Sequence, residues 1–480
     1  MSSIFEKLDR ETSEDAGFWL PLDMLVKRDL FHNKIFSADL LFLACDQKIK
    51  RRTFILTKTR LYMCKKDNKT PKIMTVISWK KLEPFIEDDG PQKKFGFRLG
   101  YRPFYQDFYL NSQYELDQWL SNLIGITIMV DFESDYAIIK QIGKGNFATV
   151  YLAEETESHA QFAIKFIDKE QIYHFPGGIG AVLSEVVIMK KINHPYIIKL
   201  YRIYEDENYV YLVLEYLKGG DLFHRIQKKE KFSESVAASF MTRLLESLKY
   251  LHALHIVHRD LKPENILMVS DDNDMEFKIC DFGLAYFSPN DQTLSCGSPG
   301  YVAPEILHKR SYNHKVDTFS SGIIMYIILS GRAPFYGQTV KEILKYNSLC
   351  RLGFHEKYWN YISKNAKNLI VSLTKPNPSI RLSAEQALKH SWFKESGLFK
   401  LSNDILPQTA CDPSDDCNIS CISFTEVKRI DDRRHLKHLE EELQVHKNDK
   451  DSNDELKKET NIENTYKKAI DIMKKLRDTE

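Results

Sequence analysis

The sequence predicts an α+β protein in which a strand-rich lobe is followed by a helix-rich lobe, with a separate strand meander before both. Three observations support this class. Residues 38 to 115 alternate strand-like runs with turn signals, and a glycine-rich turn in QIGKGNFATVYLA lies between two further strand-like runs. After about Val236 the chain becomes predominantly helical. At 480 residues it is too long for one ordinary core, so several domains are expected.

Shifts in composition divide the chain into four segments. We expect an N-terminal extension over residues 1–34, a strand-rich domain over 35–128, a two-lobed domain over 136–393 and a charged tail over 394–480. Residues 427 to 480 are dominated by Lys, Glu, Asp and Asn. Such a composition supports little packed core, so the tail is predicted to be partly helical or disordered.

The strand meander ends in SQYELDQWLSNLIG, where Ser112 is a candidate helix cap. Apolar side chains follow it at helical spacing, at Tyr114, Leu116, Trp119, Leu120 and Leu123. A meander closed by one amphipathic helix carrying a Trp resembles a pleckstrin-homology (PH) domain. That resemblance covers about 95 residues and implies a β-barrel with a C-terminal helix.

A basic cluster, Lys48, Lys50, Arg51 and Arg52, precedes the strand TFIL of this domain. PH domains that hold phosphoinositides present basic side chains there, and a head group with several phosphates favours such a cluster. However, Ala44 or Cys45 stands where those domains carry a Lys near the end of the first strand. Two ligands therefore stay open for this domain, a phosphoinositide and a docking protein, and an autoinhibitory role is a further alternative.

Two strings carry the chemistry: IVHRDLKPENIL, starting at Ile256, and KICDFGLA, ending at Ala285. They supply the carboxylates of Asp260 and Asp281, the amide of Asn265 and the ammonium of Lys262. Phosphoryl transfer needs positioning and charge neutralisation more than covalent help, so a few oxygens and cations suffice. Either string alone is weak evidence, whereas both in this order are strong evidence.

These strings resemble the catalytic and metal loops of protein kinases. The resemblance implies that Asp260 accepts the hydrogen bond of the incoming hydroxyl and that Lys262 neutralises the transferred phosphoryl group. It implies that Asn265 and Asp281 bind Mg²⁺ beside the phosphates of ATP. A Lys in HRDLKPEN is similar to the serine/threonine kinases rather than to the tyrosine kinases. The implied fold is the two-lobed kinase fold.

The same resemblance assigns a nucleotide site to the strand-rich lobe. Glycine lets backbone amides approach phosphates closely, and Ala148 stands where the family has a third Gly. Lys165 in FAIKFI would contact the phosphates and pair with Glu185 of SEVVIMKKI, while the backbone of Glu215 and Leu217 would meet the adenine edge. The loop residues implied to hold the nucleotide are Ile142, Gly143, Lys144, Gly145, Asn146, Phe147, Ala148 and Val150.

The chain from Asp281 to Glu305 resembles a kinase activation segment ending in APE. The resemblance implies a buried pair between Glu305 and Arg381 and a brace on the catalytic loop from Asp317. Phe319 stands where the family has Trp. Ser298 with Gly300 and Tyr301 resembles the serine/threonine form of the pocket for the residue after the acceptor.

Arg259 raises the question of how this segment is controlled. An Arg before the catalytic Asp commonly pairs with a phosphate on the activation segment. The usual phosphoacceptor position is occupied here by Leu294, flanked by Thr293 and Ser295. Phosphorylation is therefore expected to be shifted or absent.

The motifs GGDLF, CGSPGYVAPEIL, SGRAPF and HSWF resemble those of the calcium/calmodulin-dependent kinase group. The PH-domain kinases of the Akt class are the alternative, but they favour GTPEY where this chain has GSPGY. Asp221 and Glu264 correspond to acidic positions that imply protein substrates with basic residues upstream of the acceptor. Calmodulin stays open as a partner, with only a thin apolar stripe in the basic tail to support it.

Charge and cysteine content limit the remaining classes. Lys plus Arg is 68 against 67 for Asp plus Glu, so no overall field recruits nucleic acid, and we expect none as a partner. The eight cysteines lack paired C-x-x-C spacing and are interpreted as free thiols. No apolar signal core begins the chain, so a cytoplasmic protein is expected, with membrane recruitment open. A catalytically inactive kinase-fold scaffold is the alternative to an active enzyme.

Overall fold

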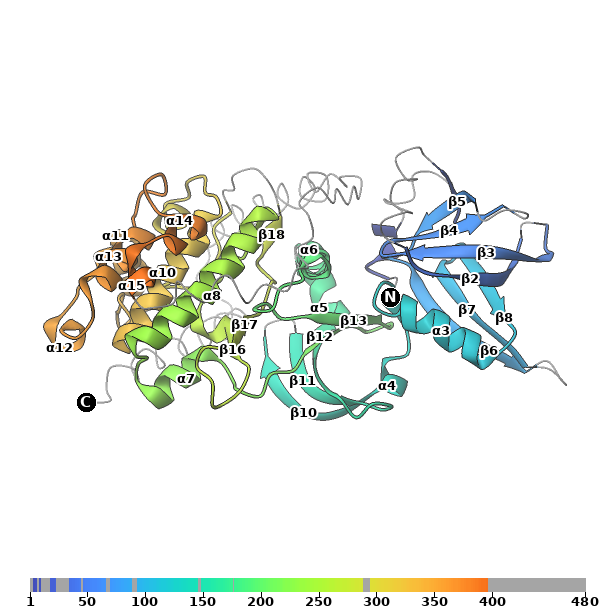
Figure 1. Ribbon diagram of the computed structural model, residues 1–480, viewed down its shortest axis with the longest axis horizontal. Helices are drawn as coiled ribbons and strands as arrows, with labels where there is room; N and C mark the ends of the chain where they lie inside the picture. Colours follow the sequence, from blue (N-terminus) through green and yellow to red (C-terminus); the bar gives the residue numbers. More distant parts are fainter. Residues whose placement is uncertain are drawn as a thin grey trace, which may run out of the picture. The chain divides into compact units, whose positions relative to one another are not determined.

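The computed structural model describes residues 3–6, 8–9, 18–22, 34–44, 46–65, 70–88, 93–145, 148–175, 177–287 and 294–395. They form two compact units. Figure 1 labels the helices and strands of both. The first unit contains the described residues up to Leu183 together with Leu200–Tyr216, and the second contains Ser184–Lys199 and the described residues from Leu217 onward. Both strands and helices are present, which confirms the mixed α+β class. The tail expected from residue 394, with its candidate calmodulin segment, lies almost entirely outside the described residues.

The first unit is built on one continuous sheet. The strand order across the described part of the chain is β1-β5-β4-β3-β2-β8-β7-β6-β9-β13-β14-β12-β11-β10. Neighbouring strands are antiparallel except where β9 pairs with β6 and with β13. The strands are β1 (Leu20–Pro21), β2 (Lys34–Leu43), β3 (Ile49–Thr57), β4 (Arg60–Cys64), β5 (Pro71–Val76), β6 (Lys81–Asp88), β7 (Lys93–Tyr101), β8 (Phe104–Leu110), β9 (Ile128–Met129), β10 (Tyr136–Lys144), β11 (Ala148–Glu155), β12 (Gln161–Asp168), β13 (Leu200–Glu205) and β14 (Tyr209–Glu215).

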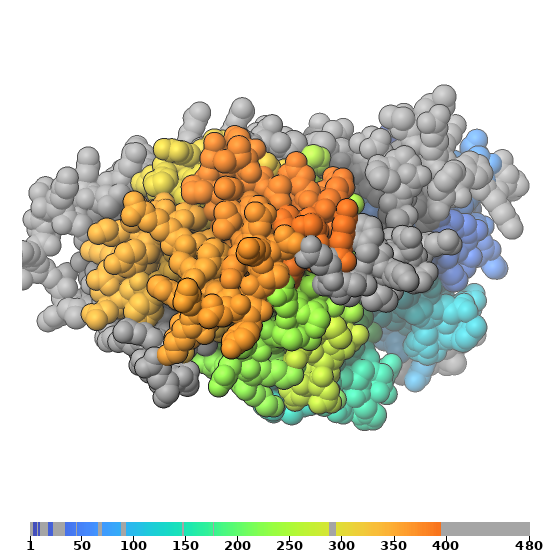
Figure 2. Space-filling model, turned by 60° about the vertical axis from the view of Figure 1, so that its left-hand side comes forward, coloured from blue at the N-terminus to red at the C-terminus, as the bar shows by residue number. Residues whose placement is uncertain are grey.

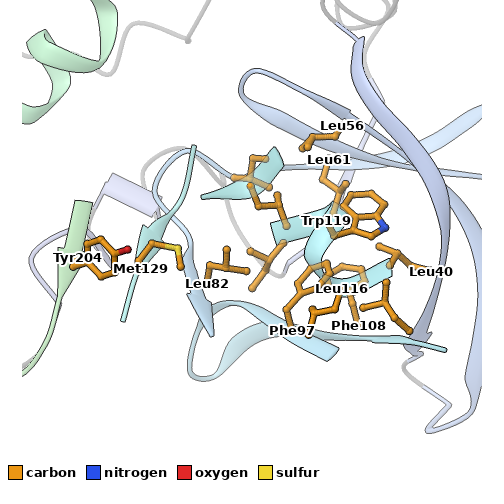
Figure 3. Close-up of a cluster of buried hydrophobic side chains, with 14 of the residues drawn as sticks. Leu40, Leu56, Leu61, Leu82, Phe97, Phe108, Leu116, Trp119, Met129 and Tyr204 are labelled. Atoms are coloured by element: carbon orange, nitrogen blue, oxygen red, sulfur yellow. The ribbon is translucent and has the colours of Figure 1, made fainter. Parts of the chain in front are cut away.

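Helix α3 (Gln113–Leu123) follows the meander as the apolar spacing predicts. Ser112 caps it by accepting a hydrogen bond from the backbone amide of Glu115 at 3.3 Å. Leu116 and Trp119 are buried among the aromatic side chains of the strands (Figure 3). Tyr114 was expected on this face but is 70% exposed, because it lies two residues before Leu116 and therefore about 200° around the helix from it, on the opposite face. The closing helix is therefore confirmed, with a narrower apolar face than predicted.

Strand β9 joins the meander to the second half of the same sheet. Ile128 pairs with Lys81 of β6, and Met129 pairs with Tyr204 of β13, beside which it lies in Figure 3. Short helices α4 (Phe132–Asp135) and α5 (Lys169–His174) and helix α6 (Gly178–Lys191) complete this part of the chain. A hydrophobic cluster runs without interruption from Trp119 to Tyr204.

Residues near the N-terminus contact both halves of this sheet. The carboxylate of Glu205 accepts a hydrogen bond from the backbone amide of Ile4 at 2.8 Å and forms an ion pair with the ammonium of Lys169 at 3.1 Å. Asp9 forms a buried ion pair with Lys80 at 2.9 Å. These polar groups are satisfied in the interior, as buried charges require. The described residues of the predicted N-terminal extension are therefore an ordered part of the unit.

The second unit is mainly helical. Helix α10 is buried along almost its whole length and packs against α8. Later residues of this unit form the surface that is coloured orange in Figure 2. Among the described residues, no helix is both long and apolar enough to cross a membrane. The elements are α7 (Leu222–Lys229), α8 (Glu234–Ala253), β15 (Ile256–Val257), η1 (Pro263–Asn265), β16 (Ile266–Met268), β17 (Phe277–Ile279), β18 (Tyr286–Phe287), α9 (Pro304–Leu307), α10 (Lys315–Ser330), α11 (Val340–Leu349), α12 (Glu356–Trp359), α13 (Lys364–Leu373), α14 (Ala384–Leu388) and α15 (Ser391–Glu395).

Candidate active site

The loop between β15 and β16 is held in shape by Asp317 of α10. The two carboxylate oxygens of Asp317 accept hydrogen bonds from the backbone amides of His258 and Arg259, each at 2.9 Å, and His252 lies 3.0 Å away. Burial opposes ionisation of Asp317, yet hydrogen bonds from His252 and from the backbone of His258 hold the pKa of its carboxyl below its usual value. Arg259 has a φ of 67°, a strained backbone that this brace stabilises. The predicted brace is confirmed.

Four polar side chains converge at the end of this loop. Asp260 accepts a hydrogen bond from the hydroxyl of Ser298 at 2.7 Å and pairs with the ammonium of Lys262 at 3.0 Å. Lys262 also donates to Ser298 at 2.8 Å. Asn265 donates through its amide nitrogen to the backbone oxygen of Asp260 at 2.8 Å and to its carboxylate at 3.2 Å. The sequence predicted Asp260 and Lys262 as catalytic residues and Asn265 as a metal ligand, and the structure brings the three together with Ser298.

The charge of Lys262 is maintained by its neighbours. Burial opposes the charged form of this ammonium, but Asp260 and Glu264 outweigh burial and raise its pKa. The negative charge of Asp281 also raises this pKa. Asp260 and Lys262 therefore form a preorganised carboxylate and ammonium pair.

Asp281 follows β17 with a φ of 61°, and its carboxylate accepts a hydrogen bond from the amide of Gly283 at 3.3 Å. Phe282 turns the opposite way and is fully buried, with its ring centroid 5.0 Å from that of His258. His258 in turn is 3.0 Å from the backbone oxygen of Cys280. These contacts tie the DFG turn to the catalytic loop and leave Asp281 at the surface.

The donor set near Asp281 fits a hard divalent cation bound together with phosphate. Asn265 uses its NH₂ group towards Asp260, so its side-chain oxygen is the atom it can offer to a metal ion. Among the described residues, no three His, Cys, Asp or Glu side chains gather as a metal centre. A cation held by one carboxylate and one amide oxygen needs further ligands, which phosphate oxygens and water supply for Mg²⁺.

The glycine-rich turn lies between β10 and β11 in the first unit. Gly143 pairs with Val150, and Lys144 pairs with Thr149 across the hairpin. The amide of Gly145 donates to the backbone oxygen of Ala148 at 2.7 Å, which closes the turn tightly. Ile142 lies on β10 and is 41% exposed. Asn146 and Phe147, which follow Gly145 in the sequence, lie outside the described residues.

The other predicted nucleotide residues fall on regular elements. Lys165 lies on β12, opposite Val150 of β11 on one side and Leu212 of β14 on the other. Glu185 lies on α6 and is only 5% exposed. Glu215 ends β14, and Leu217 follows two residues later. Lys165 and Glu185 belong to different units, so their ion pair remains a prediction.

The end of the activation segment is anchored by a buried ion pair. Arg381 donates to the two carboxylate oxygens of Glu305 at 2.6 and 2.8 Å. The side chains of Arg381 and Glu305 are 0% and 4% exposed, and the guanidinium lies 5.1 Å from the centre of the Phe319 ring. The predicted pair is confirmed, and Phe319 contributes packing at the place where the family has Trp.

Two residues of this region were not predicted. Asn347 of α11 is fully buried, accepts a hydrogen bond from the amide of Gly300 at 3.0 Å and donates to the backbone oxygen of Val302 at 2.8 Å. The hydroxyl of Tyr312 contacts Arg259. Neither residue stands in a recognisable motif of the sequence, so no sequence signal pointed to them.

Comparison with known proteins agrees with this geometry. The model of the protein kinase domain matches residues 136–393. Probable serine/threonine-protein kinase 2 of Plasmodium falciparum is 42% identical over 290 residues, which are 60% of this chain and 56% of that protein. Myosin light chain kinase A of Dictyostelium discoideum is 42% identical over 275 residues, which are 56% of this chain and 91% of that protein. Calcium-dependent protein kinase 5 of Plasmodium falciparum is 42% identical over 271 residues, which are 56% of this chain and 46% of that protein.

The chain belongs to the protein kinase family. Its relatives carry the names of serine/threonine kinases, including a myosin light chain kinase and a calcium-dependent kinase. The chain spans about half the length of the two Plasmodium relatives and nearly all of the Dictyostelium one.

Proposed function

We propose that this protein transfers the γ-phosphate of ATP to Ser and Thr hydroxyls of protein substrates. The proposal is based mainly on the cluster of Asp260, Lys262, Asn265 and Ser298. Each of these side chains forms a hydrogen bond or an ion pair with another residue of the cluster. Asp260 accepts the hydrogen bond of the incoming hydroxyl and orients it. Lys262 neutralises charge that develops on the transferred phosphoryl group.

The remaining site residues serve the nucleotide. Bound Mg²⁺ neutralises the phosphates, and Asn265 and Asp281 are the residues that would hold it. The backbone of the turn around Gly143 and Gly145 would cover the phosphates and Lys165 would contact them, while the pairing of Lys165 with Glu185 stays an expectation from the family resemblance. The backbone of Glu215 and Leu217 binds the adenine edge. An inactive scaffold is the weaker alternative, since all of these residues are present.

The acidic side chains of Glu264 and Asp221 favour substrates with basic residues upstream of the acceptor. One carboxylate oxygen of Glu264 is buried with no hydrogen-bond partner among the described residues, and burial raises the pKa of this carboxyl. An unpaired buried acceptor is costly, and an Arg guanidinium from a substrate would satisfy it. Asp221, the second predicted acid, already contacts His224 at 2.7 Å. We therefore assign the main recognition of substrate Arg to Glu264.

A peptide-library assay with labelled ATP tests the substrate proposal. Peptides with Arg at each upstream position are compared with Ala peptides, for wild type and for Glu264→Gln. The Arg preference is expected to fall about tenfold or more in the variant, as expected when one charge-assisted hydrogen bond is lost. Asp271→Asn, at a 74% exposed carboxylate, is the control and should keep the preference. An unchanged preference in Glu264→Gln would exclude the assigned role.

For the strand-rich domain we propose protein docking or autoinhibition ahead of phosphoinositide binding. PH identity remains a prediction that the strands and α3 support. Within the basic cluster, Lys50 pairs with Asp46 at 2.7 Å and Arg51 pairs with Asp39 at 3.0 Å, so part of its charge is already neutralised. Sedimentation of the full chain with phosphoinositide vesicles tests this proposal. If much more protein sediments with these vesicles than with neutral ones, phosphoinositide binding becomes the favoured function of this domain.

Cell location and calcium control are proposals from the sequence. We propose a cytoplasmic protein with a signalling role, and membrane recruitment depends on the vesicle result above. Activity assays with and without calcium and calmodulin test the resemblance to the calcium/calmodulin-dependent group. An increase on addition would support a calmodulin segment in the tail, and equal rates would exclude it.

A further inference from the structure

The hydroxyl of Tyr312 links the catalytic loop to the activation segment in the second unit. It accepts a hydrogen bond from a terminal guanidinium nitrogen of Arg259 at 3.1 Å. It uses its own proton to donate to the backbone oxygen of Leu294 at 2.7 Å. Leu294 is the residue at the usual phosphoacceptor position, so the contact falls where a phosphate would otherwise meet Arg259.

Arg259 is bound here by neutral groups. Its Nε donates to the backbone oxygen of Leu284 at 2.7 Å, and its guanidinium lies 5.1 Å from the centre of the Tyr286 ring. Asp317 contacts the backbone amide of Arg259 and thereby fixes where the side chain begins. A hydroxyl, a carbonyl and an aromatic face together replace the anion that this Arg commonly binds.

The surroundings fix Tyr312 in this position. It lies in the segment that connects α9 to α10 along the chain, and its side chain is buried, with 2% of the residue exposed. Burial raises the pKa of the Tyr312 hydroxyl, so the group keeps the proton that it donates to Leu294. The hydroxyl therefore acts as donor and acceptor at once, which a Phe cannot do.

Gly297 brings the same two segments into close approach. It has a φ of 105°, and a Cβ at this position would lie 2.8 Å from the backbone oxygen of Arg259. Such a distance does not occur for a real side chain, so the segment touches the catalytic loop through a residue that must be Gly. Along the chain, Leu294, which Tyr312 contacts, precedes Cys296, and Gly297 directly follows it.

We propose that Tyr312 is a positioning residue that orders the activation segment without a phosphoryl group on it. Its hydroxyl holds Leu294 to Arg259, and the ordered segment presents Ser298 to Asp260 and Lys262. The inference rests on the proposed kinase function and deepens it, because it states how that site is kept in its active arrangement.

The test compares Tyr312→Phe with a matched control, Tyr326→Phe, in the full chain. Tyr326 is also a buried Tyr of the same unit whose hydroxyl donates to a backbone oxygen, that of Gly353 at 2.5 Å. Both variants are treated with a phosphatase, checked by mass spectrometry, and assayed for kcat, for KM of ATP and for hydrogen exchange of residues 294–305.

In Tyr312→Phe, kcat should fall about tenfold or more, which is the typical effect of losing a hydrogen bond to a charged group. The KM of ATP should change less than about twofold, because the nucleotide residues are untouched. Amide exchange in the segment should speed up. Tyr326→Phe should change none of these, and wild type should keep its kcat after phosphatase treatment.

A double-variant cycle separates positioning from simple packing. In an Arg259→Gln background, removing the Tyr312 hydroxyl should cost less than about twofold in kcat, since its partner is already gone. If Tyr312→Phe lowered kcat in the Arg259→Gln background as much as it does in the wild type, the proposed link between Tyr312 and Arg259 would be wrong. Wild-type kcat and exchange in Tyr312→Phe would overturn it as well, as would loss of wild-type activity when a phosphate at Thr293 or Ser295 is removed.

The exchange measurement keeps this inference separate from the proposed function. If the wild type transferred no phosphate to any protein or peptide, the kinase proposal would fail. Faster exchange in Tyr312→Phe but not in Tyr326→Phe would then still support the structural link. Equal exchange in both variants would reject that link whether or not the protein is active.

Discussion

Replacing Glu305 with Gln should destabilise the helix-rich unit strongly. The change keeps the size of the side chain but removes the charge that Arg381 faces across distances of 2.6 and 2.8 Å. Both groups are almost completely buried, so water cannot take the place of the lost carboxylate. Breaking such a pair costs about 3 to 5 kcal/mol.

The contacts that remain place the expected loss at the lower end of that range. Arg381 still donates to the backbone oxygens of Lys315, Lys375 and Pro376, at distances of 2.9 to 3.3 Å. We therefore expect the free energy of unfolding to fall by about 3 kcal/mol. Hydrogen exchange of the α10 amides measures it, because α10 is the most buried helix that the pair supports.

Two companion variants test the reasoning. Glu385→Gln removes a pair between exposed side chains, Lys389 and Glu385, which are 73% and 57% exposed, and should change stability by less than about 0.5 kcal/mol. The double change of Glu305→Leu with Arg381→Met removes both charges, so it should cost less than Glu305→Gln alone. A loss below about 1 kcal/mol in Glu305→Gln, or a larger loss in the double variant, would refute the argument.

Three further changes have defined outcomes. Ser298→Ala removes the hydroxyl that donates to Asp260, so kcat should fall about tenfold while nucleotide affinity from titration stays the same, and an unchanged kcat would deny the hydroxyl its role. Burial lowers the pKa of His194 from 6.5 to about 4, so the unfolded state binds an extra proton between these values and stability falls as the pH drops through this range. The free energy of unfolding, measured with urea at a series of pH values, should change less with pH for His194→Gln than for the wild type. An equal dependence on pH would contradict that assignment. Lys80→Met removes the ammonium from buried Asp9 and should destabilise the strand-rich unit by about 3 kcal/mol, measured by exchange of strand amides, whereas a loss near zero would show that the pair is dispensable.

Contacts within motifs were predictable from the sequence, because a motif fixes both the residue type and its role. The pair of Glu305 with Arg381 and the brace from Asp317 are examples, and so is the Ser112 cap, which depends only on neighbouring residues. The closing helix was placed correctly by its apolar spacing, although Tyr114 proved exposed.

Contacts between distant segments without a motif were not predictable. Tyr312 contacts Arg259, 53 residues earlier in the chain, and Asn347 contacts Gly300, 47 residues earlier. The N-terminal contacts of Ile4 with Glu205 likewise join residues far apart in the chain. Such pairs depend on the relative position of whole elements, which a single sequence does not state.

The central claim is that Asp260 takes part in phosphoryl transfer from ATP. Asp260→Asn keeps the shape of the side chain and can still meet Lys262 and Ser298, but it loses the charge that orients the incoming hydroxyl. The measurement is transfer of labelled γ-phosphate to Ser and Thr peptides, paired with a nucleotide-binding titration. We predict that the variant binds ATP with the affinity of the wild type and transfers no phosphate. Transfer at the wild-type rate would contradict the claim.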